Sequence, residues 1–166
     1  GAFSRLKARA AVPHQLVLAG SDWTRAEEVH KAAAESPCAK DIVFTGFVPG
    51  ADLPAFYGGA ELFVFPSLYE GFGLPVLEAL ACGAAVACGD GSSLPEVAGP
   101  GALLLPPSDV SAWALALLRL AQDSALCARL RAQGRIHAAA FTWERTARAT
   151  AAAYCDALAL QGGHIP

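Results

Sequence analysis

Two carboxylates and two glycines lie close together in one short segment, which offers more chemistry than any other part of the sequence. The segment reads Glu70-Gly-Phe-Gly-Leu-Pro-Val-Leu-Glu78 and follows residues 62–65, an apolar run with the pattern of a buried strand. Gly71 and Gly73 allow the backbone to approach a ligand closely, because neither carries a Cβ atom. Since ligands of open parallel sheets bind where the strands end, we expect a binding site here.

A helix predicted over residues 74–82 would add a positive terminus to this site. Pro75 fits the first turn of that helix, where a missing N–H group costs nothing. The first N–H groups of a helix have no partners within it, and the helix dipole adds positive charge at the same end. We therefore expect the backbone N–H groups of Gly73, Leu74 and Val76 to bind an anion such as a phosphate or diphosphate.

The two carboxylates differ in position, which gives them different partners. Glu78, expected in the first turn of the helix, could accept hydrogen bonds from two neighbouring hydroxyls such as a ribose diol. Glu70, on the loop, could accept from the hydroxyls of a sugar beyond the phosphates. A diol, a diphosphate and a hexose together describe a nucleotide sugar. Simpler interpretations stay open: Glu78 stabilises a helix dipole, Glu70 is a solvated charge, and the glycines form turns.

Apolar runs alternate with helical patterns along the whole chain, and this alternation predicts the elements that position the site. Strand patterns that are apolar throughout indicate a parallel sheet covered by helices on both faces. Ser93 and Glu96 have the spacing of a capping box, which predicts a short helix there. We expect strands at residues 14–19, 41–48, 62–65, 84–88 and 102–105, and helices at residues 3–11, 25–35, 53–57, 74–82, 110–121, 124–140 and 143–160.

The composition excludes several classes of protein. With 166 residues, 54% of them hydrophobic and 16% charged, the chain suits one folded domain rather than a disordered segment. A net charge of −3 and the absence of any run of Lys or Arg argue against a surface that binds nucleic acid or an anionic membrane. The 5 Cys and 4 His show neither a disulfide nor a zinc pattern, which favours free thiols in a reducing cytoplasm. No apolar run is long enough for direct membrane insertion.

The segment at residues 70–78 closely resembles the E-x7-E signature of retaining GT-B glycosyltransferases of family 4, the group 1 glycosyltransferases. Ala79-Leu80-Ala81-Cys82-Gly83 continues the likeness. Further family motifs resemble this sequence in the same order, so that the resemblance covers about residues 3–158: "LVLVG" at residues 16–20, "VRFLGYVP" at 43–49, "ADLFVFPS" at 60–67, "SLPEVAG" at 93–99 and "FSWE" at 141–144.

In this family two Rossmann-like domains face a cleft, and residues 1–166 resemble only the C-terminal, donor-binding domain. The resemblance implies an α/β fold, a Rossmann-like parallel sheet with helices on both faces. It implies that Glu78 holds the donor ribose and that Glu70 holds the transferred sugar as the catalytic residue. The other donor-binding positions that it implies are Gly20, Phe47, Val48, Gly71, Phe72, Gly73 and Leu74.

The reaction that the resemblance implies is transfer of a hexosyl group from a nucleotide sugar to an acceptor, with retention at the anomeric carbon. The donor would be a UDP-, GDP- or ADP-sugar, with no metal and no further cofactor. The sequence does not fix the base, the sugar or the acceptor. A cytoplasmic location is expected, with peripheral membrane association decided by other parts of the full-length protein.

The sequence departs from the family pattern at its start. The family's donor domain begins with a strand and a loop whose Arg and Lys neutralise the diphosphate, whereas residues 3–11 resemble the helix that follows them. Lys7 and Arg9 lie too late in this helix to replace that pair. Since the chain also has no Met, we expect a piece of a longer protein, with the N-terminal acceptor domain absent and helix 143–160 packing toward it.

Without its first strand the sheet would be incomplete. In the strand order 3-2-1-4-5-6 that strand is central. The strands at residues 14–19 and 62–65 would then either pair directly or leave a gap with unpaired backbone groups, which is costly. We expect a rearranged sheet, pairing between molecules, or a strand supplied by the full-length protein.

Other functional classes are weighed against this one. A non-catalytic, truncated GT-B module that serves as a binding or interaction domain is favoured by the absent Arg and Lys, and opposed by the intact segment at residues 70–78. A GT-B phosphorylase or epimerase would share the architecture. A dinucleotide-dependent oxidoreductase needs G-x-G-x-x-G after its first strand, and Gly20-Ser21-Asp22-Trp23 does not supply it. We expect the isolated chain to bind a nucleotide sugar weakly and to be inactive in transfer.

Overall fold

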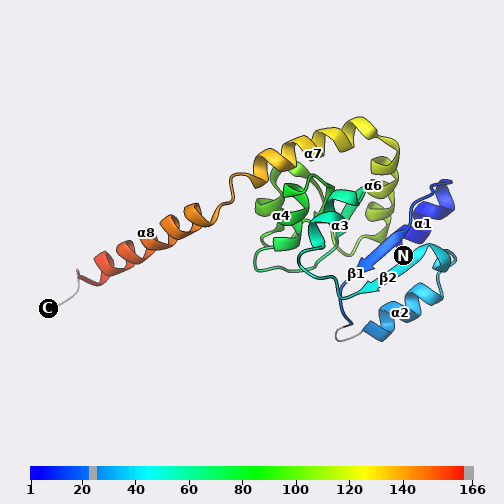
Figure 1. Cartoon of the computed structure of the whole chain (residues 1–166), viewed down its shortest axis with the longest axis horizontal. Helices are drawn as coiled ribbons and strands as arrows, with labels where there is room; N and C mark the ends of the chain where they lie inside the picture. The colour runs from blue at the N-terminus through cyan, green and yellow to red at the C-terminus, as the bar shows by residue number, and fades with distance from the viewer. Residues whose placement is uncertain (23–25, 163–166) are drawn as a thin grey trace.

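The computed structural model describes residues 1–22 and 26–162, and the side chains as far as residue 160. Parallel strands alternate with helices, which confirms the predicted α/β class with helices flanking the sheets (Figure 1). The predicted start of the second helix, at Arg25, lies outside the described residues. The strands are β1 (Leu16–Ala19), β2 (Ile42–Gly46), β3 (Leu62–Phe65), β4 (Ala85–Gly89) and β5 (Ala102–Leu105).

The helices lie close to their predicted places, with ends that differ by a few residues. They are α1 (Ala2–Arg9), α2 (Ala26–Ala34), α3 (Leu53–Gly59), α4 (Leu74–Ala81), α5 (Leu94–Ala98), α6 (Val110–Gln122), α7 (Ser124–Ala138) and α8 (Trp143–Gly162). Two short 3-10 helices, η1 (Ala39–Asp41) and η2 (Gly99–Gly101), precede β2 and β5.

The strands form two separate parallel sheets. β1 pairs with β2, and β4 lies between β3 and β5, all in parallel. Among the described residues no strand pairs with the second edge of β1 or of β3. Of the two alternatives, the structure shows the gap and not direct pairing. Within the described residues no strand fills this gap, since the residues before β1 form helix α1.

The core is built around β4, whose residues are all buried. Its side chains alternate between two layers. Val86 and Cys88 face one layer, with Leu80 of α4 and Leu94 of α5. Ala85 and Ala87 face the other, which is formed by α6 and α7 through Trp113, Leu120, Leu126, Cys127 and Leu130. Burial on both faces explains why the strand is apolar throughout.

Helix α1 connects the two sheets. Phe3 and Leu6 on its buried side join a cluster with Leu117 of α6, and this cluster contacts Leu16 of β1 and Leu62 of β3. A second link lies just before the two strands, where the His14 ring nitrogen Nε2 is 2.6 Å from Oε2 of Glu61. The two sheets are thus held by a helix and a polar contact in place of strand pairing.

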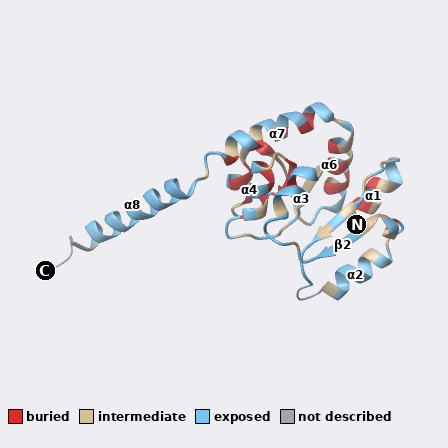
Figure 2. Cartoon of the chain, viewed as in Figure 1, coloured by how far each residue is buried: buried red, intermediate tan, exposed pale blue. Residues whose placement is uncertain are grey.

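Helix α8 extends away from the rest of the chain (Figure 1), and its described side chains are exposed (Figure 2). Several of them are large and apolar, which is unusual for a solvated helix: Trp143, Tyr154, Leu158 and Leu160. Within the described part of the chain, no helix combines the length and the apolar character needed to cross a bilayer.

The open edge of β3 predicts a pattern of amide hydrogen exchange. Successive N–H groups of a strand point to opposite neighbours, so those of β4 are bonded on both sides, and about half of those of β3 lack a strand acceptor. We expect these β3 amides to exchange at least about tenfold faster than the amides of β4, measured by NMR. Protection of every β3 amide to the level of β4 would contradict an open edge.

Candidate functional site

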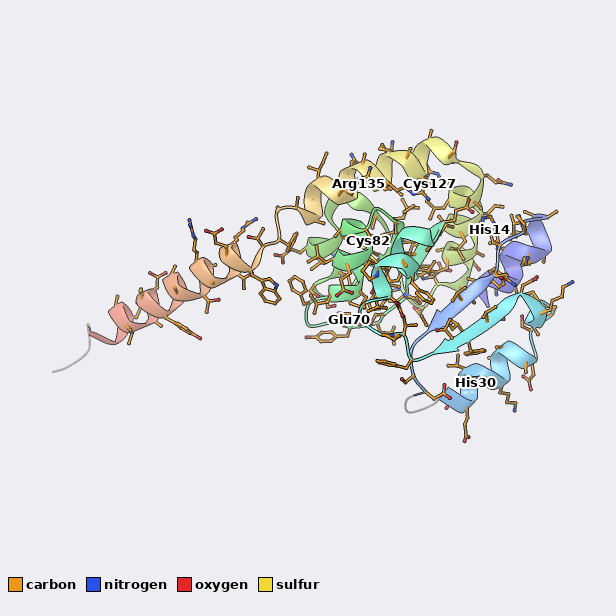
Figure 3. The ribbon with its side chains drawn as sticks, in the orientation of Figure 1. His14, His30, Glu70, Cys82, Cys127 and Arg135 are labelled. Atoms are coloured by element: carbon orange, nitrogen blue, oxygen red, sulfur yellow. The ribbon has the colours of Figure 1, made fainter. Side chains whose placement is uncertain are left out.

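The loop between β3 and α4 lies at the carboxyl end of the three-stranded sheet and carries the predicted segment. The register pairs Phe65 with Cys88, so the loops that follow β3 and β4 start side by side. Their backbones approach so closely that a Cβ atom on Gly89 would lie 2.5 Å from the carbonyl oxygen of Ser67. The structure therefore gathers Glu70 to Leu74 at one end of the sheet, where Figure 3 labels Glu70.

Gly73 forms the junction between this loop and α4. Its φ of 103° is left-handed, and a Cβ atom there would lie 2.7 Å from Cδ2 of Leu94, so both conformation and space require glycine. The N–H groups of Gly73 and Leu74 have no hydrogen-bond partner among the described residues and remain open for a ligand. The expectation for Val76 is wrong, because its N–H donates to the carbonyl oxygen of Gly73 at 3.0 Å.

Two serines after β4 hold the loop in place. The N–H of Glu70 donates to Oγ of Ser92 at 2.9 Å. The hydroxyl of Ser93 lies 3.0 Å from the carbonyl oxygen of Glu70 and 2.8 Å from that of Phe72, to which it donates. Ser92 adopts a φ of 52°, which is uncommon outside glycine and is found where the surrounding structure enforces it.

These contacts correct the predicted capping box. Ser93 is the N-cap residue of α5, but its side chain makes no capping hydrogen bond. The capping spacing correctly predicts where the helix begins. The hydroxyl instead binds the loop, because the register of β3 and β4 brings two loop carbonyls within its reach.

An aromatic contact fixes the same loop from the side of α7. The ring of Phe72 meets that of Phe141 edge-on, with centroids 6.1 Å apart. Phe141 in turn contacts the ring of His137, whose Nε2 is 3.1 Å from the carbonyl oxygen of Glu96. Phe72 is thus held by its ring as well as by its carbonyl group, and the backbone between Glu70 and Gly73 has contacts on both sides.

The side chain of Glu70 is free although its peptide groups are not. Both its N–H and its carbonyl group are bonded to serines, whereas its carboxylate has no hydrogen bond or ion pair with any described residue. The residue is half-buried. A carboxylate on a fixed backbone, with both oxygens open, is suited to accept hydrogen bonds from ligand hydroxyls.

Glu78 lies in the second turn of α4, and not in the first turn as predicted. The helix has no acidic residue in its first turn. Since the dipole effect falls off within that turn, the simpler explanation of Glu78 as a dipole partner loses its basis. Oε2 of Glu78 accepts a hydrogen bond of 2.9 Å from the hydroxyl of Tyr57 on α3. Sequence analysis missed Tyr57, which lies 21 positions away with no local pattern to mark it.

The remaining predicted residues lie at the carboxyl end of the other sheet. Gly20 follows β1, has a φ of 135°, and donates its N–H to the carbonyl oxygen of Gly46 at 3.0 Å. β2 ends at Gly46, before its predicted end, so Phe47 and Val48 come just after the strand. Phe47 is 75% exposed. The structure thus divides the predicted residues between the two sheets.

Basic side chains of α1 serve the fold. Nζ of Lys7 is 2.9 Å from Oδ2 of Asp41 and donates to the carbonyl oxygen of Val12 at 2.9 Å. The ammonium group of Lys7 thus links α1 to the segment before β2.

Comparison with known proteins gives one consistent result. Residues 1–137 match the sequence profile of the family described as "Glycosyl transferases group 1". The O-antigen chain mannosyltransferase B of Escherichia coli is 44% identical over 113 residues, which cover 68% of this chain and 30% of that protein.

Solved structures agree on the fold. Sucrose-phosphate synthase (tll1590) from Thermosynechococcus elongatus has a TM-score of 0.79 and 31% identity, covering 96% of this chain and 43% of that one. Anabaena Alr3699/HepE, solved in complex with UDP and glucose, has a TM-score of 0.77 at 20% identity, with 95% of this chain and 45% of that one covered. The chain thus spans about a third of the curated relative and less than half of either solved structure.

Removing the hydroxyl of Ser93 tests how the loop is held. In Ser93→Ala the carbonyl groups of Glu70 and Phe72 lose their donor, so the free energy of unfolding falls by about 1 kcal/mol. Amide exchange at residues 70–73 should accelerate, while α5 keeps its protection because Ser93 does not cap it. Ser108→Ala, on an exposed loop, serves as the control. Faster amide exchange in α5 with unchanged exchange at residues 70–73 would show instead that Ser93 caps α5 and does not hold the loop.

Proposed function

The chain belongs to the glycosyl transferases group 1 family, and from this premise we propose that it is the donor-binding part of a GT-B glycosyltransferase. In this proposal it binds a nucleotide sugar and presents a hexosyl group for transfer to an acceptor, with retention of configuration. The acceptor is bound by a part of the full-length protein outside this chain. No metal ion or further cofactor is needed.

One observation carries the proposal: the loop from Glu70 to Gly73 is fixed through its backbone while its ligand-binding groups are open. The serines and Phe141 hold the loop. The N–H groups of Gly73 and Leu74 and the carboxylate of Glu70 have no described partner. N–H groups at a helix start suit a diphosphate, and a fixed carboxylate suits sugar hydroxyls. Preorganised groups of this kind favour binding, because little freedom is lost when the ligand arrives.

Each end of the donor is assigned to one of the two sheets. The diphosphate meets the N–H groups of Phe72, Gly73 and Leu74, with Gly71 giving the backbone room to approach. Glu78 accepts from the ribose, and Glu70 holds the transferred sugar next to the bond that breaks. The base lies against Phe47 and Val48, with Gly20 at the end of β1 leaving space, since no atom of the described residues lies within 4 Å of a Cβ atom built there.

This proposal does not specify which base and which sugar the donor carries. UDP-, GDP- and ADP-sugars all present the same diphosphate and ribose, so the groups assigned above do not distinguish them. Because the Escherichia coli relative is named a mannosyltransferase, a mannose-bearing nucleotide sugar is the first donor to test.

The exposed apolar side chains of α8 fit a role in the full-length protein. Trp143, Tyr154 and Leu158 follow one another at spacings of 11 and 4 residues, which places them near one side of a helix with 3.6 residues per turn. We propose that this side packs against the acceptor-binding part. The proposed location of the enzyme is the cytoplasm.

Two alanine variants separate the proposed roles of the carboxylates. Glu78→Ala removes the ribose acceptor and should weaken both the nucleoside diphosphate and the nucleotide sugar by at least about tenfold. Glu70→Ala should weaken the nucleotide sugar alone, because only the sugar reaches it. Calorimetry with UDP, GDP and ADP and their sugars measures both effects. The matched control is Glu35→Ala, which removes an exposed carboxylate just after α2 and should leave binding unchanged.

If Glu78→Ala binds nucleoside diphosphates and nucleotide sugars as tightly as the unaltered chain does, Glu78 does not hold the ribose. The isolated chain should show no sugar transfer when supplied with donor and candidate acceptors. Full transfer by this chain alone would contradict the assignment of acceptor binding to another part of the protein. Failure to bind any nucleotide or nucleotide sugar would favour the alternative of a non-catalytic interaction domain.

A further inference from the structure

The hydroxyl group of Tyr57 lies at the edge of an apolar core. The residue is 9% exposed and belongs to the cluster that includes Val76 and Leu80. Its ring meets that of Phe63 edge-on, with centroids 5.2 Å apart and planes at 82°. Phenylalanine would satisfy all of this packing. A hydroxyl in such a place costs free energy unless it has a hydrogen-bond partner, so its presence points to a specific use.

That partner is Glu78. The Tyr57 hydroxyl donates to Oε2 across the contact between α3 and α4, at 2.9 Å. Within the described part of the chain, neither side chain makes another hydrogen bond or ion pair. Burial, reinforced by the hydrogen bond and charge of Glu78, raises the pKa of Tyr57 well above its usual value. The phenol therefore keeps its proton and remains a donor to the carboxylate at ordinary pH.

The contact leaves most of the carboxylate available. A carboxylate has about four lone-pair sites, and Tyr57 occupies one of them. Oε1 and the second site of Oε2 stay open on the exposed side of α4. A glutamate side chain that is otherwise free loses substantial rotamer entropy when a ligand fixes it. Tyr57, itself held by Phe63, fixes the carboxylate before any ligand arrives.

We propose that Tyr57 is a positioning residue for Glu78, and that its hydroxyl orients the carboxylate to accept hydrogen bonds from the two hydroxyls of a ribose. This inference rests on the proposed function, because it takes Glu78 as the ribose acceptor. It adds a residue on a different helix that never touches the ligand. The site then distinguishes a ribonucleotide from a deoxyribonucleotide through two residues and not through Glu78 alone.

The test compares a ribonucleoside diphosphate with its 2′,3′-dideoxy analogue on the full chain. The base is whichever of UDP, GDP and ADP the unaltered chain binds most tightly. Tyr57→Phe keeps the ring and removes one oxygen, and we expect it to bind the ribonucleotide about tenfold more weakly. Its affinity for the dideoxy analogue should equal that of the unaltered chain, because the analogue presents nothing to the carboxylate. In a Glu78→Ala background, Tyr57→Phe should have no further effect.

Tyr154→Phe makes the same chemical change on α8, at a tyrosine that is 69% exposed, and should leave both affinities unchanged. Thermal unfolding of each variant shows whether it is folded, and Glu78→Gln gives a second conservative probe of the same contact. A purely structural role for Tyr57 predicts equal losses for the two nucleotides, and that result would overturn the proposal. Unchanged ribonucleotide binding by Tyr57→Phe would overturn it as well.

Different results would contradict the ribose role of Glu78 and the positioning role of Tyr57. If Glu78→Ala still prefers the ribonucleotide as strongly as the unaltered chain does, the ribose role of Glu78 is wrong and the role of Tyr57 fails with it. If Glu78→Ala loses the preference while Tyr57→Phe retains it in full, only the positioning role is wrong. Absence of any nucleotide binding to the unaltered chain would overturn both.

Discussion

Complete burial of β4 is the constraint on which the rest of the structure depends. A strand buried on both faces must satisfy its backbone through neighbouring strands, and β3 and β5 do this on its two edges. Its small and medium-sized side chains let α4 and α5 approach from one side and α6 and α7 from the other. The layers, the order of the three strands and the positions of the loops all follow from this arrangement.

The arrangement of the candidate site follows from the register between β3 and β4. Because Phe65 lies opposite Cys88, the loop after β4 runs beside the loop after β3, and the hydroxyls of Ser92 and Ser93 come within reach of it. The rigid part of the site is therefore backbone held by side chains from a neighbouring loop. Its open part consists of N–H groups and carboxylate oxygens. This separation of support from binding is typical of sites that bind without large rearrangement.

Sequence patterns predict the helices and strands well where nearby residues determine where an element begins and ends. The bounds of β3 and β5 follow from apolar runs that end at proline residues, and the helix at residues 74–81 follows from Pro75 near its start. β1 and β2 are shorter than predicted: β1 begins only after the polar residues His14 and Gln15, and β2 ends at Gly46, before Phe47 and Val48. The split between the two sheets could only be posed as alternatives, because pairing is a property of the whole chain.

The site could be predicted in part for the same reason. The spacing within residues 70–78 predicts the glycines and both carboxylates as site residues, and the structure places Glu70 on the loop that leads to the N–H groups of Gly73 and Leu74 at the start of α4. The use of Ser93 was misjudged, since a capping motif describes one helix and says nothing of a loop 21 residues away. Tyr57 was missed because its contact with Glu78 depends on how α3 packs against α4. Contacts between elements leave no periodic trace in a sequence.

The position of α1 has a consequence for the reach of the site. In the proposed function the residues assigned to the base follow one sheet and those assigned to the sugar follow the other, and among the described residues no strand pairing joins the two sheets. Two features link the sheets: Phe3 and Leu6 of α1, in the cluster that contacts Leu16 of β1 and Leu62 of β3, and the contact between His14 and Glu61. In the proposed complex, the packing of α1 between the two sheets therefore contributes to the distance that the ligand must span.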